Sequence, residues 1–208
     1  GDGKIYAFLG PNGSGKTTFM KIIASLTKQS EGELLLDGKA LSIKSRADIA
    51  YLPTETHAYP FMTVGEFGEY YKTFFKDFDE IRYKSWVERM KIPFRTPFKV
   101  LSSGMDKKVR VAATLAREAK GLILDEPFNG VDLLAREEIE KMILEVMSDN
   151  RTIILSSHLV EEVESYVNFA LFFNEGRLLA MEDVEELRSS RGMSITDRYR
   201  ELLGRVGE

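Results

Sequence analysis

The chain has 208 residues, of which 43% are hydrophobic, enough for one large domain or for one domain with an inserted lobe. Its formal net charge of −4 argues against nucleic acid as a partner, because a polyanion requires a concentrated basic face. The absence of cysteine excludes disulfides and thiolate metal sites and fits an intracellular location, and no apolar run approaches the roughly 20 residues of a membrane helix. We therefore expect no direct membrane span.

The first predicted element is a strand over residues 5–9, and a glycine-rich loop follows it directly. The loop reads Gly10-Pro11-Asn12-Gly13-Ser14-Gly15-Lys16-Thr17, which is the pattern G-x-x-x-x-G-K-[ST]. Glycines allow successive backbone N–H groups to turn inward around a polyanion, and a helix that begins near Lys16 directs its positive end to the same point. The sequence predicts a site for a nucleoside triphosphate, and the flanking strand and helix disfavour the alternative of a surface turn.

Side chains at the start of this helix supply the rest of the predicted site. Lys16 provides a mobile cation for the terminal phosphates, the Thr17 hydroxyl is placed to ligate Mg²⁺, and Thr18 follows at the same end of the helix. Apolar residues then recur at i, i+3, i+4 and i+7, and we expect these four to form a buried face: Phe19, Ile22, Ile23 and Leu26.

The middle of the chain changes from strands to helices. A hairpin is predicted over residues 34–41 around Asp37-Gly38, and a strand over 49–52. Thr63-Val64-Gly65-Glu66 is a capping box, and four apolar residues further on lie on one helical face: Tyr83, Trp86, Val87 and Met90. Residues 63–104 are therefore predicted to form a helical lobe.

Strands and helices alternate again after Gly104. Helices are predicted around residues 109–116 and 139–147, strands over 122–124 and 152–155, and a hairpin from strands 169–173 and 178–181. The charged tail from residue 182 onward resembles short surface helices. Such alternation predicts an α/β fold with a mostly parallel sheet and, from the hairpin at 34–41, a small antiparallel sheet.

Polar residues follow two of the predicted strands, at the edge where α/β sheets bind ligands. Asp125 and Glu126 end the strand 122–124: Asp125 is predicted to hold Mg²⁺, directly or through water, and Glu126 to act as general base or to orient the attacking water. His158 comes just after the strand 152–155, where an imidazole can contact both a γ-phosphate and Glu126. A solvated acidic pair and a structural histidine are the plain alternatives, and the phosphate loop disfavours both.

A second anion-binding segment is predicted at Leu101-Ser102-Ser103-Gly104-Met105. A serine hydroxyl and free backbone N–H groups at a helix N-terminus bind anions, although capping of the helix by Ser102 or Ser103 accounts for part of the pattern. Because the chain already has one complete phosphate loop, we expect this segment to contact the γ-phosphate held by another subunit.

These segments together resemble the nucleotide-binding domain of ABC transporters, over nearly the whole chain and in the family's order. Residues 10–17 are similar to its Walker A motif, 101–105 to its LSGGQ signature, 122–126 to its Walker B motif, 129–132 with Asp132 to its D-loop, and His158 to its switch histidine. The resemblance implies a P-loop NTPase of the ABC type that hydrolyses ATP with Mg²⁺. In that family two subunits pair head to tail, each ATP lies between one Walker A motif and the other signature, and a transmembrane permease docks near the helical lobe.

The resemblance also suggests the organisation of the chain. We expect one ABC ATPase domain over residues 1–208, with an α/β core at 1–62 and 105–185, a helical subdomain at 63–104 and a C-terminal helical tail at 186–208. Because the chain begins with a glycine and not with Met, the natural N-terminus is expected to lie upstream. The LSSGM spelling and the compact domain look most like ABC-2 type export subunits, at the inner face of the cell membrane.

Three residues depart from the family pattern. Thr54 stands where the family usually has a glutamine, Ser103 replaces a signature glycine, and Met105 replaces the signature glutamine. A nucleotide-binding regulator without hydrolysis therefore stays open as an alternative, as does a non-transport ABC ATPase of DNA repair or translation. The roughly 85 residues between Lys16 and Leu101 are too few for a long coiled-coil insertion, which disfavours the latter.

Overall fold

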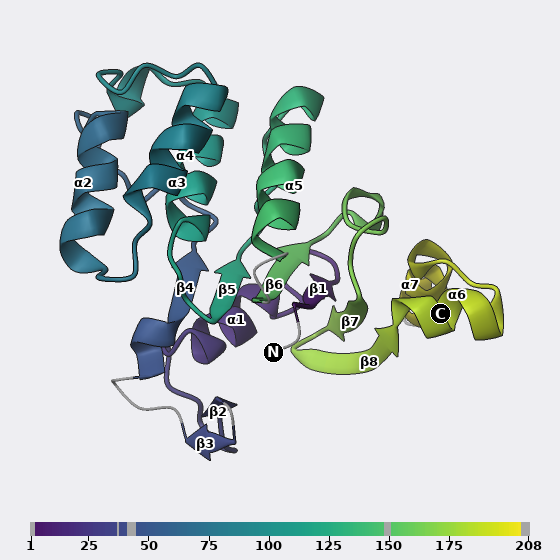
Figure 1. Ribbon diagram of the computed structural model, residues 1–208. Helices are drawn as coiled ribbons and strands as arrows, with labels where there is room; N and C mark the ends of the chain where they lie inside the picture. Colours follow the sequence, from purple (N-terminus) through teal and green to yellow (C-terminus); the bar gives the residue numbers. More distant parts are fainter. Residues whose placement is uncertain (1–2, 37, 41–44, 148–150, 205–208) are drawn as a thin grey trace.

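A six-stranded sheet forms the centre of the computed structural model, which describes residues 3–36, 38–40, 45–147 and 151–204 (Figure 1). Five neighbouring strands are parallel, and the sixth, β8, is antiparallel to β7 at one edge. This arrangement confirms the predicted α/β fold. In spatial order the strands are β4 (Ile49–Leu52), β5 (Gly121–Leu124), β6 (Thr152–Ser157), β1 (Ile5–Leu9), β7 (Phe169–Asn174) and β8 (Arg177–Asp183).

A separate two-stranded antiparallel sheet contains β2 (Leu35–Leu36) and β3 (Lys39–Ala40), as the hairpin pattern predicts. Asp37 and Leu41 of that prediction lie outside the described residues. The helices are α1 (Lys16–Ile23), α2 (Val64–Phe74), α3 (Glu80–Arg89), α4 (Ser103–Leu115), α5 (Leu133–Met147), α6 (Val184–Arg191) and α7 (Ile195–Gly204), with short 3-10 helices η1 (Ser45–Asp48), η2 (Phe98–Val100) and η3 (Val160–Glu162).

Helices cover both faces of the central sheet, so its apolar strands are buried on two sides. Ile5, Ala7 and Leu9 of β1 belong to a large cluster with apolar residues of α4 and α5, whereas Phe8 belongs to a smaller cluster with Met20 of α1. Successive side chains of a strand point to opposite faces, which explains why β1 is apolar throughout rather than alternating.

The predicted buried face of α1 is wrong. Lys16 and Met20 are the buried residues of this helix, whereas 43% of Phe19 and 62% of Leu26 are exposed. The helix ends at Ile23, so Leu26 lies beyond it. Phe19 lies beside the sheet, with its ring 5.7 Å from that of Phe8. Ile22 and Ile23 are half-buried, and Ile23 packs against the smaller cluster that contains the buried Met20 and Ala24.

The helices α2, α3 and α4 lie beside one another, away from the two-stranded sheet (Figure 1). Thr63 caps α2 in the predicted capping box, since its hydroxyl accepts from the Glu66 N–H and the Glu66 carboxylate accepts from the Thr63 N–H. Tyr83 of α3 is buried and donates to the Val64 carbonyl at 2.7 Å. The helical segment is thereby confirmed, and the exact subdomain boundaries stay a prediction.

The C-terminal part is more deeply packed than the predicted surface helices. β8 continues to Asp183, whose carboxylate caps α6, and Val184, Leu187 and Ile195 are almost fully buried. These side chains belong to the larger apolar cluster of the sheet, which explains their burial. No helix in the described part of the chain has the length and apolar character needed to cross a bilayer.

Candidate functional site

A pocket of about 290 Å³ lies at the phosphate loop, next to the carboxyl end of β5. It is lined by Asn12, Gly13, Ser14, Gly15, Lys16, Thr17, Thr18, Thr54, Glu126 and Asn129. Parallel strands present their carboxyl ends at one edge of a sheet, which is where such folds bind ligands. The structure thus brings most of the predicted phosphate-loop residues together with Glu126.

The glycines of the loop are needed for its backbone shape. Gly13 and Gly15 have φ values of 80° and 98°, in the left-handed region that side chains disfavour. A Cβ on Gly10 would overlap the Phe173 carbonyl oxygen and lie 2.8 Å from Ser14 Oγ. The chain therefore passes close to β7 at Gly10, and this close approach fixes the loop against the sheet.

Ser14 Oγ is one of three buried side-chain polar atoms without a hydrogen-bond partner in the described residues. The side chain is 2% exposed, and the serine forms part of the pocket lining. A buried hydroxyl without a partner is unfavourable unless a ligand completes its hydrogen bonds. Its position in the phosphate loop fits a phosphate oxygen as the missing partner.

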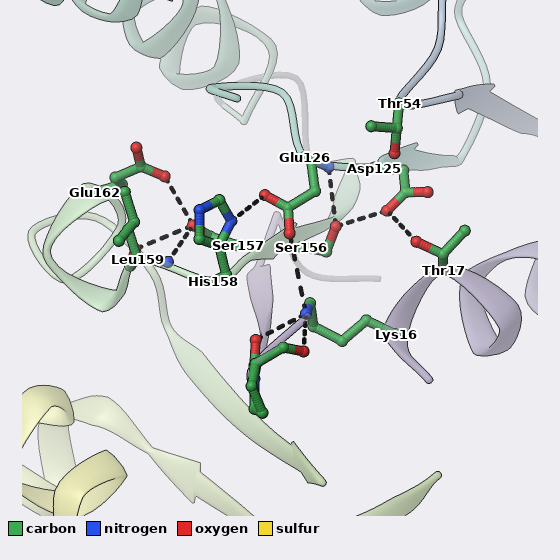
Figure 2. Close-up of polar contacts among 12 residues, drawn as sticks. Lys16, Thr17, Thr54, Asp125, Glu126, Ser156, Ser157, His158, Leu159 and Glu162 are labelled. Atoms are coloured by element: carbon green, nitrogen blue, oxygen red, sulfur yellow. Dashed lines mark hydrogen bonds and ion pairs between the residues drawn. The ribbon is translucent and has the colours of Figure 1, made fainter. Parts of the chain in front are cut away.

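Lys16 lines the pocket and is 5% exposed, with its ammonium group against backbone oxygens (Figure 2). Its Nζ donates to the carbonyls of Gly10 at 2.7 Å and Pro11 at 3.0 Å, and it lies 3.9 Å from Glu126 Oε1. Burial lowers the pKa of Lys16, while the nearby carboxylates of Glu126 and Asp125 raise it. The loop thus holds a buried amine close to the phosphate site.

Asp125 is fully buried and accepts hydrogen bonds from three hydroxyl groups. Thr17 Oγ1 lies 3.0 Å and Ser156 Oγ 2.8 Å from its Oδ1, and the Tyr51 hydroxyl lies 3.1 Å from its Oδ2. Burial, with the Asp125 carboxylate nearby, raises the pKa of Tyr51, so this phenol stays a donor. The site combines carboxylate and hydroxyl oxygens.

These oxygens fit Mg²⁺, which prefers oxygen ligands and takes one or two carboxylates together with substrate phosphates. The adjacent Thr17 and Asp125 match such a set. Within the described residues, no group of three or more His, Asp or Glu side chains forms a metal cage. With one carboxylate and one hydroxyl, Asp125 and Thr17 suit a cation that also takes oxygens from a bound triphosphate.

Glu126 connects the lysine to the histidine at the edge of the pocket (Figure 2). His158 Nδ1 lies 2.9 Å from Glu126 Oε2, and Ser156 Oγ accepts from the Glu126 N–H at 2.9 Å. Glu126 has a φ of 49°, a conformation that non-glycine residues seldom adopt. The Glu126 carboxylate lies between Lys16 and His158; the contact with His158 is the predicted one, and the water-positioning role stays a prediction.

The signature segment lies outside this pocket. Ser102 Oγ accepts from the Met105 N–H at 3.2 Å and so caps α4, and Ser103 Oγ donates to the Gly130 carbonyl at 3.3 Å. Asp132 Oδ1 accepts from the Ala135 N–H at 2.8 Å at the start of α5. The segments of Ser102, Ser103 and Gly104 and of Asp132 thus lie near each other, and none of these four residues lines the pocket.

Sequence reasoning did not place Tyr51 or Ser156 at the site, and it assigned Asn129 to the D-loop rather than to the pocket lining. The registers that bring the first two to Asp125 pair Leu52 of β4 and Leu155 of β6 with Leu124 of β5. A search for polar residues near the carboxyl ends of all predicted strands would have found Tyr51 and Ser156. Asn129 follows Glu126 by three residues, and its N–H donates to the Glu126 carbonyl at 3.2 Å in a tight turn.

Comparison with known proteins agrees with this site. Residues 1–129 match the family model described as ABC transporter. The chain belongs to the ABC transporter family. It is an ATPase domain of the ABC type, and the lantibiotic transport ATP-binding protein SrtF of Streptococcus pyogenes is 31% identical to it over 193 residues, covering 89% of this chain and 84% of SrtF.

Other ABC relatives are longer than this chain. The ABC transporter ATP-binding protein YtrB of Bacillus subtilis (strain 168) is 28% identical over 189 residues, and the match spans 89% of this chain and 65% of YtrB. The arabinose import ATP-binding protein AraG of Yersinia pestis is 31% identical, and 37% of its length is covered. The printed name of AraG is that of an import protein, whereas that of SrtF gives transport without a direction.

Solved structures share the fold. The ATP-binding subunit of an ABC transporter matches with a TM-score of 0.85 and 26% identity, covering 97% of this chain and 88% of that chain. A dimeric ATP-binding cassette in a post-hydrolysis state with ADP and Pi matches with a TM-score of 0.76 and 20% identity, covering 88% and 86%.

Proposed function

We propose that this ABC domain hydrolyses ATP as one half of a pair of nucleotide-binding subunits and thereby powers a membrane permease. The observation that carries the proposal is the Glu126 carboxylate, with one oxygen 2.9 Å from His158 Nδ1 and the other 3.9 Å from Lys16 Nζ. A carboxylate held between two nitrogen groups at the mouth of a phosphate loop suits the positioning of an attacking water.

In the proposed reaction, Glu126 accepts a hydrogen bond from water and aims its oxygen at the γ-phosphorus. A new P–O bond forms while the bond to the β–γ bridging oxygen breaks, and the products are ADP, inorganic phosphate and one proton, which passes through Glu126 or phosphate to solvent. His158 holds the carboxylate in place and contacts the γ-phosphate. Lys16 exchanges its loop carbonyls for oxygens of the terminal phosphates.

Backbone N–H groups within residues 12–18 would bind the phosphates, with Ser14 Oγ as an added donor. Thr17 and Asp125 would hold Mg²⁺, which neutralises charge on the β- and γ-phosphates when bound. Two hydroxyl groups besides that of Thr17 already orient Asp125, from Tyr51 and Ser156. The buried carboxylate is thus fixed before the cation arrives.

The other half of each reaction site is proposed to come from the paired subunit. Its Ser102, Ser103 and Gly104, at the N-terminus of α4, would contact the γ-phosphate, and its Asp132 would lie at the same interface. Support comes from their position outside their own pocket and from the affinity of helix N-termini for anions. The dimeric state named for the structurally similar cassette is consistent with this pairing.

Export is the proposed direction of transport, and the inner face of the cell membrane is the proposed location. Both rest on the resemblance of residues 101–105 to ABC-2 type export subunits. The relatives' printed functions, lantibiotic transport and arabinose import, support a transport role and leave the direction to experiment. Transport assays in inverted vesicles with the co-purifying permease would decide it.

Substitution Glu126→Gln tests the hydrolytic proposal. The amide keeps the size of the side chain and loses the carboxylate charge, so we expect phosphate release by the full-length protein to fall by about 100-fold or more, with ATP still bound. Phosphate release and fluorescent-nucleotide titration measure the two effects. Unchanged turnover in the Gln variant would contradict the role of Glu126.

A further inference from the structure

Two buried cations on α4 contact the loop that follows β4. Lys107 is 5% and Arg110 3% exposed. Lys107 Nζ donates to the carbonyl of Thr54 at 3.3 Å, and Arg110 Nη1 donates to those of Pro53 at 3.3 Å and Glu55 at 3.0 Å. One helix thus binds three consecutive backbone carbonyls, and this loop includes Thr54, which lines the nucleotide pocket.

Lys107 differs from Arg110 in one respect, because it also reaches the catalytic segment. Its Nζ donates to the Glu126 carbonyl at 3.1 Å, whereas the Arg110 guanidinium pairs with Asp106 at 2.8 Å. In the described part of the chain, Lys107 has these two carbonyls as hydrogen-bond partners and no ion pair. Burying an ammonium group without a carboxylate partner carries a desolvation penalty, and the two backbone hydrogen bonds offset part of it.

Burial also changes the pKa of the Lys107 ammonium group. Desolvation, assisted by Arg110, lowers the pKa of Lys107 to about 8, and Asp106, Asp125 and Glu126 act in the opposite direction. Either form of the amine has N–H groups enough for two carbonyls. The contacts to Thr54 and Glu126 are therefore available on both sides of that pKa.

The backbone of Glu126 is held from two sides. Its N–H donates to Ser156 Oγ of β6, its C=O accepts from Lys107 of α4 and from the Asn129 N–H of its own turn, and its φ is 49°. Left-handed residues other than glycine persist where surrounding contacts fix them. Lys107 thus helps to set the direction in which the Glu126 carboxylate points.

We propose that Lys107 is a positioning residue for ATP hydrolysis, tying the signature end of α4 to the backbone of Glu126 and Thr54. Lys107 follows Gly104 by three residues, within the first turns of the same helix. A displacement of the signature loop on contact with a second subunit therefore reaches the Glu126 carboxylate through Lys107. This inference rests on the proposed hydrolysis and adds the residue that connects the signature helix to it.

Three variants of the full-length protein test the inference. Lys107→Met removes the donors at similar length, and Lys107→Gln keeps an N–H₂ donor. Lys108→Met is the matched control, since Lys108 pairs with Glu138 of α5 instead. We expect kcat to fall about tenfold or more in Lys107→Met with KM within about threefold, to recover to within about threefold of the wild type in Lys107→Gln, and to stay within about twofold in Lys108→Met.

Amide exchange of the nucleotide-free protein supplies a second readout. Peptides that contain residues 53–55 and 125–127 are expected to exchange about fivefold faster in Lys107→Met than in Lys108→Met, because the tie between them is lost. Should the Met variant not fold, Lys107→Gln with the same exchange measurement takes its place, with an intermediate rate expected. Wild-type exchange in the folded Lys107 variants would overturn the inference.

The kinetic outcomes separate this inference from the proposed function. If the wild type hydrolyses ATP, Glu126→Gln does not, and Lys107→Met keeps a kcat within about twofold of the wild type, Lys107 has no positioning role. Equal losses in Lys107→Met and Lys107→Gln would contradict the donor's part in it. A wild type without hydrolysis would refute the proposed function, and the exchange experiment would still decide whether Lys107 ties the two segments.

Discussion

The phosphate loop and the signature loop are built alike and surrounded differently. Each lies at the N-terminus of a helix, with Gly15 before α1 and Ser102 before α4. The phosphate loop faces a buried lysine and the Glu126 carboxylate in its own chain, whereas Ser103 is exposed and contacts the Gly130 carbonyl. The first loop therefore lies beside buried charged groups of its own chain, whereas the second is proposed to meet the phosphate of a paired subunit.

Of the variants that compare the two loops, the largest effect is expected from charge at the signature loop. Ser103→Glu adds a carboxylate opposite the partner's γ-phosphate, so we expect turnover to fall by about 100-fold, because like charges in an interface cost several kcal/mol. Glutamate is favourable in the first turn of a helix, so the isolated subunit is expected to stay stable.

The control is Ser103→Gln, whose side chain has nearly the same shape as glutamate without the charge. A steady-state phosphate-release assay should find it within about fivefold of the wild type. Equal turnover of the two variants would contradict the half-site account.

A smaller effect is expected within the phosphate-loop half. His158→Ala removes the hydrogen bond to Glu126, and such bonds to charged groups contribute about 1.5–3 kcal/mol, so kcat should fall roughly 10- to 100-fold. The only other histidine in the sequence is His57, whose Nε2 lies 2.9 Å from the Tyr71 hydroxyl, away from Glu126. His57→Gln is therefore the control, and its kcat is expected within about twofold of the wild type. Equal losses in both variants would show that the effect is not specific to Glu126.

Ser14→Ala should give two small changes of opposite sign. Removing a buried hydroxyl that lacks a partner should raise the free energy of unfolding of the nucleotide-free protein by about 1 kcal/mol. Loss of a donor to phosphate should weaken ATP binding by about five- to tenfold. Urea denaturation and nucleotide titration measure the two. Lower stability without nucleotide, or unchanged affinity, would contradict the assignment of Ser14 Oγ to phosphate.

Local patterns predicted the sheet and the phosphate site because both depend on neighbours in sequence. The apolar run 5–9 and the capping box at Thr63 appear where expected, and the polar residues after two strands meet because parallel strands end at one edge. The helical periodicity gave the wrong buried face for α1. The helix ends at Ile23, before Leu26, and Phe19 lies at the rings of Phe8 and Phe173 while partly exposed.

The contacts of Tyr51 and Lys107 were beyond sequence reasoning for a different reason. Tyr51 reaches Asp125 through the register of β4 on β5, and Lys107 reaches Thr54 and Glu126 through the docking of α4 on a distant loop. In the sequence, Lys107 stands in a short basic cluster with Lys108 and Arg110. Burial and long-range packing turn it into an internal contact.

The pairing of two subunits over bound ATP is the central claim, and light scattering of full-length Glu126→Gln tests it most directly. With MgATP, the account predicts that the molar mass doubles, and that a second substitution, Ser103→Glu, restores the mass of a single subunit. A molar mass that stays at one subunit at saturating MgATP, while nucleotide titration shows ATP bound, would contradict it.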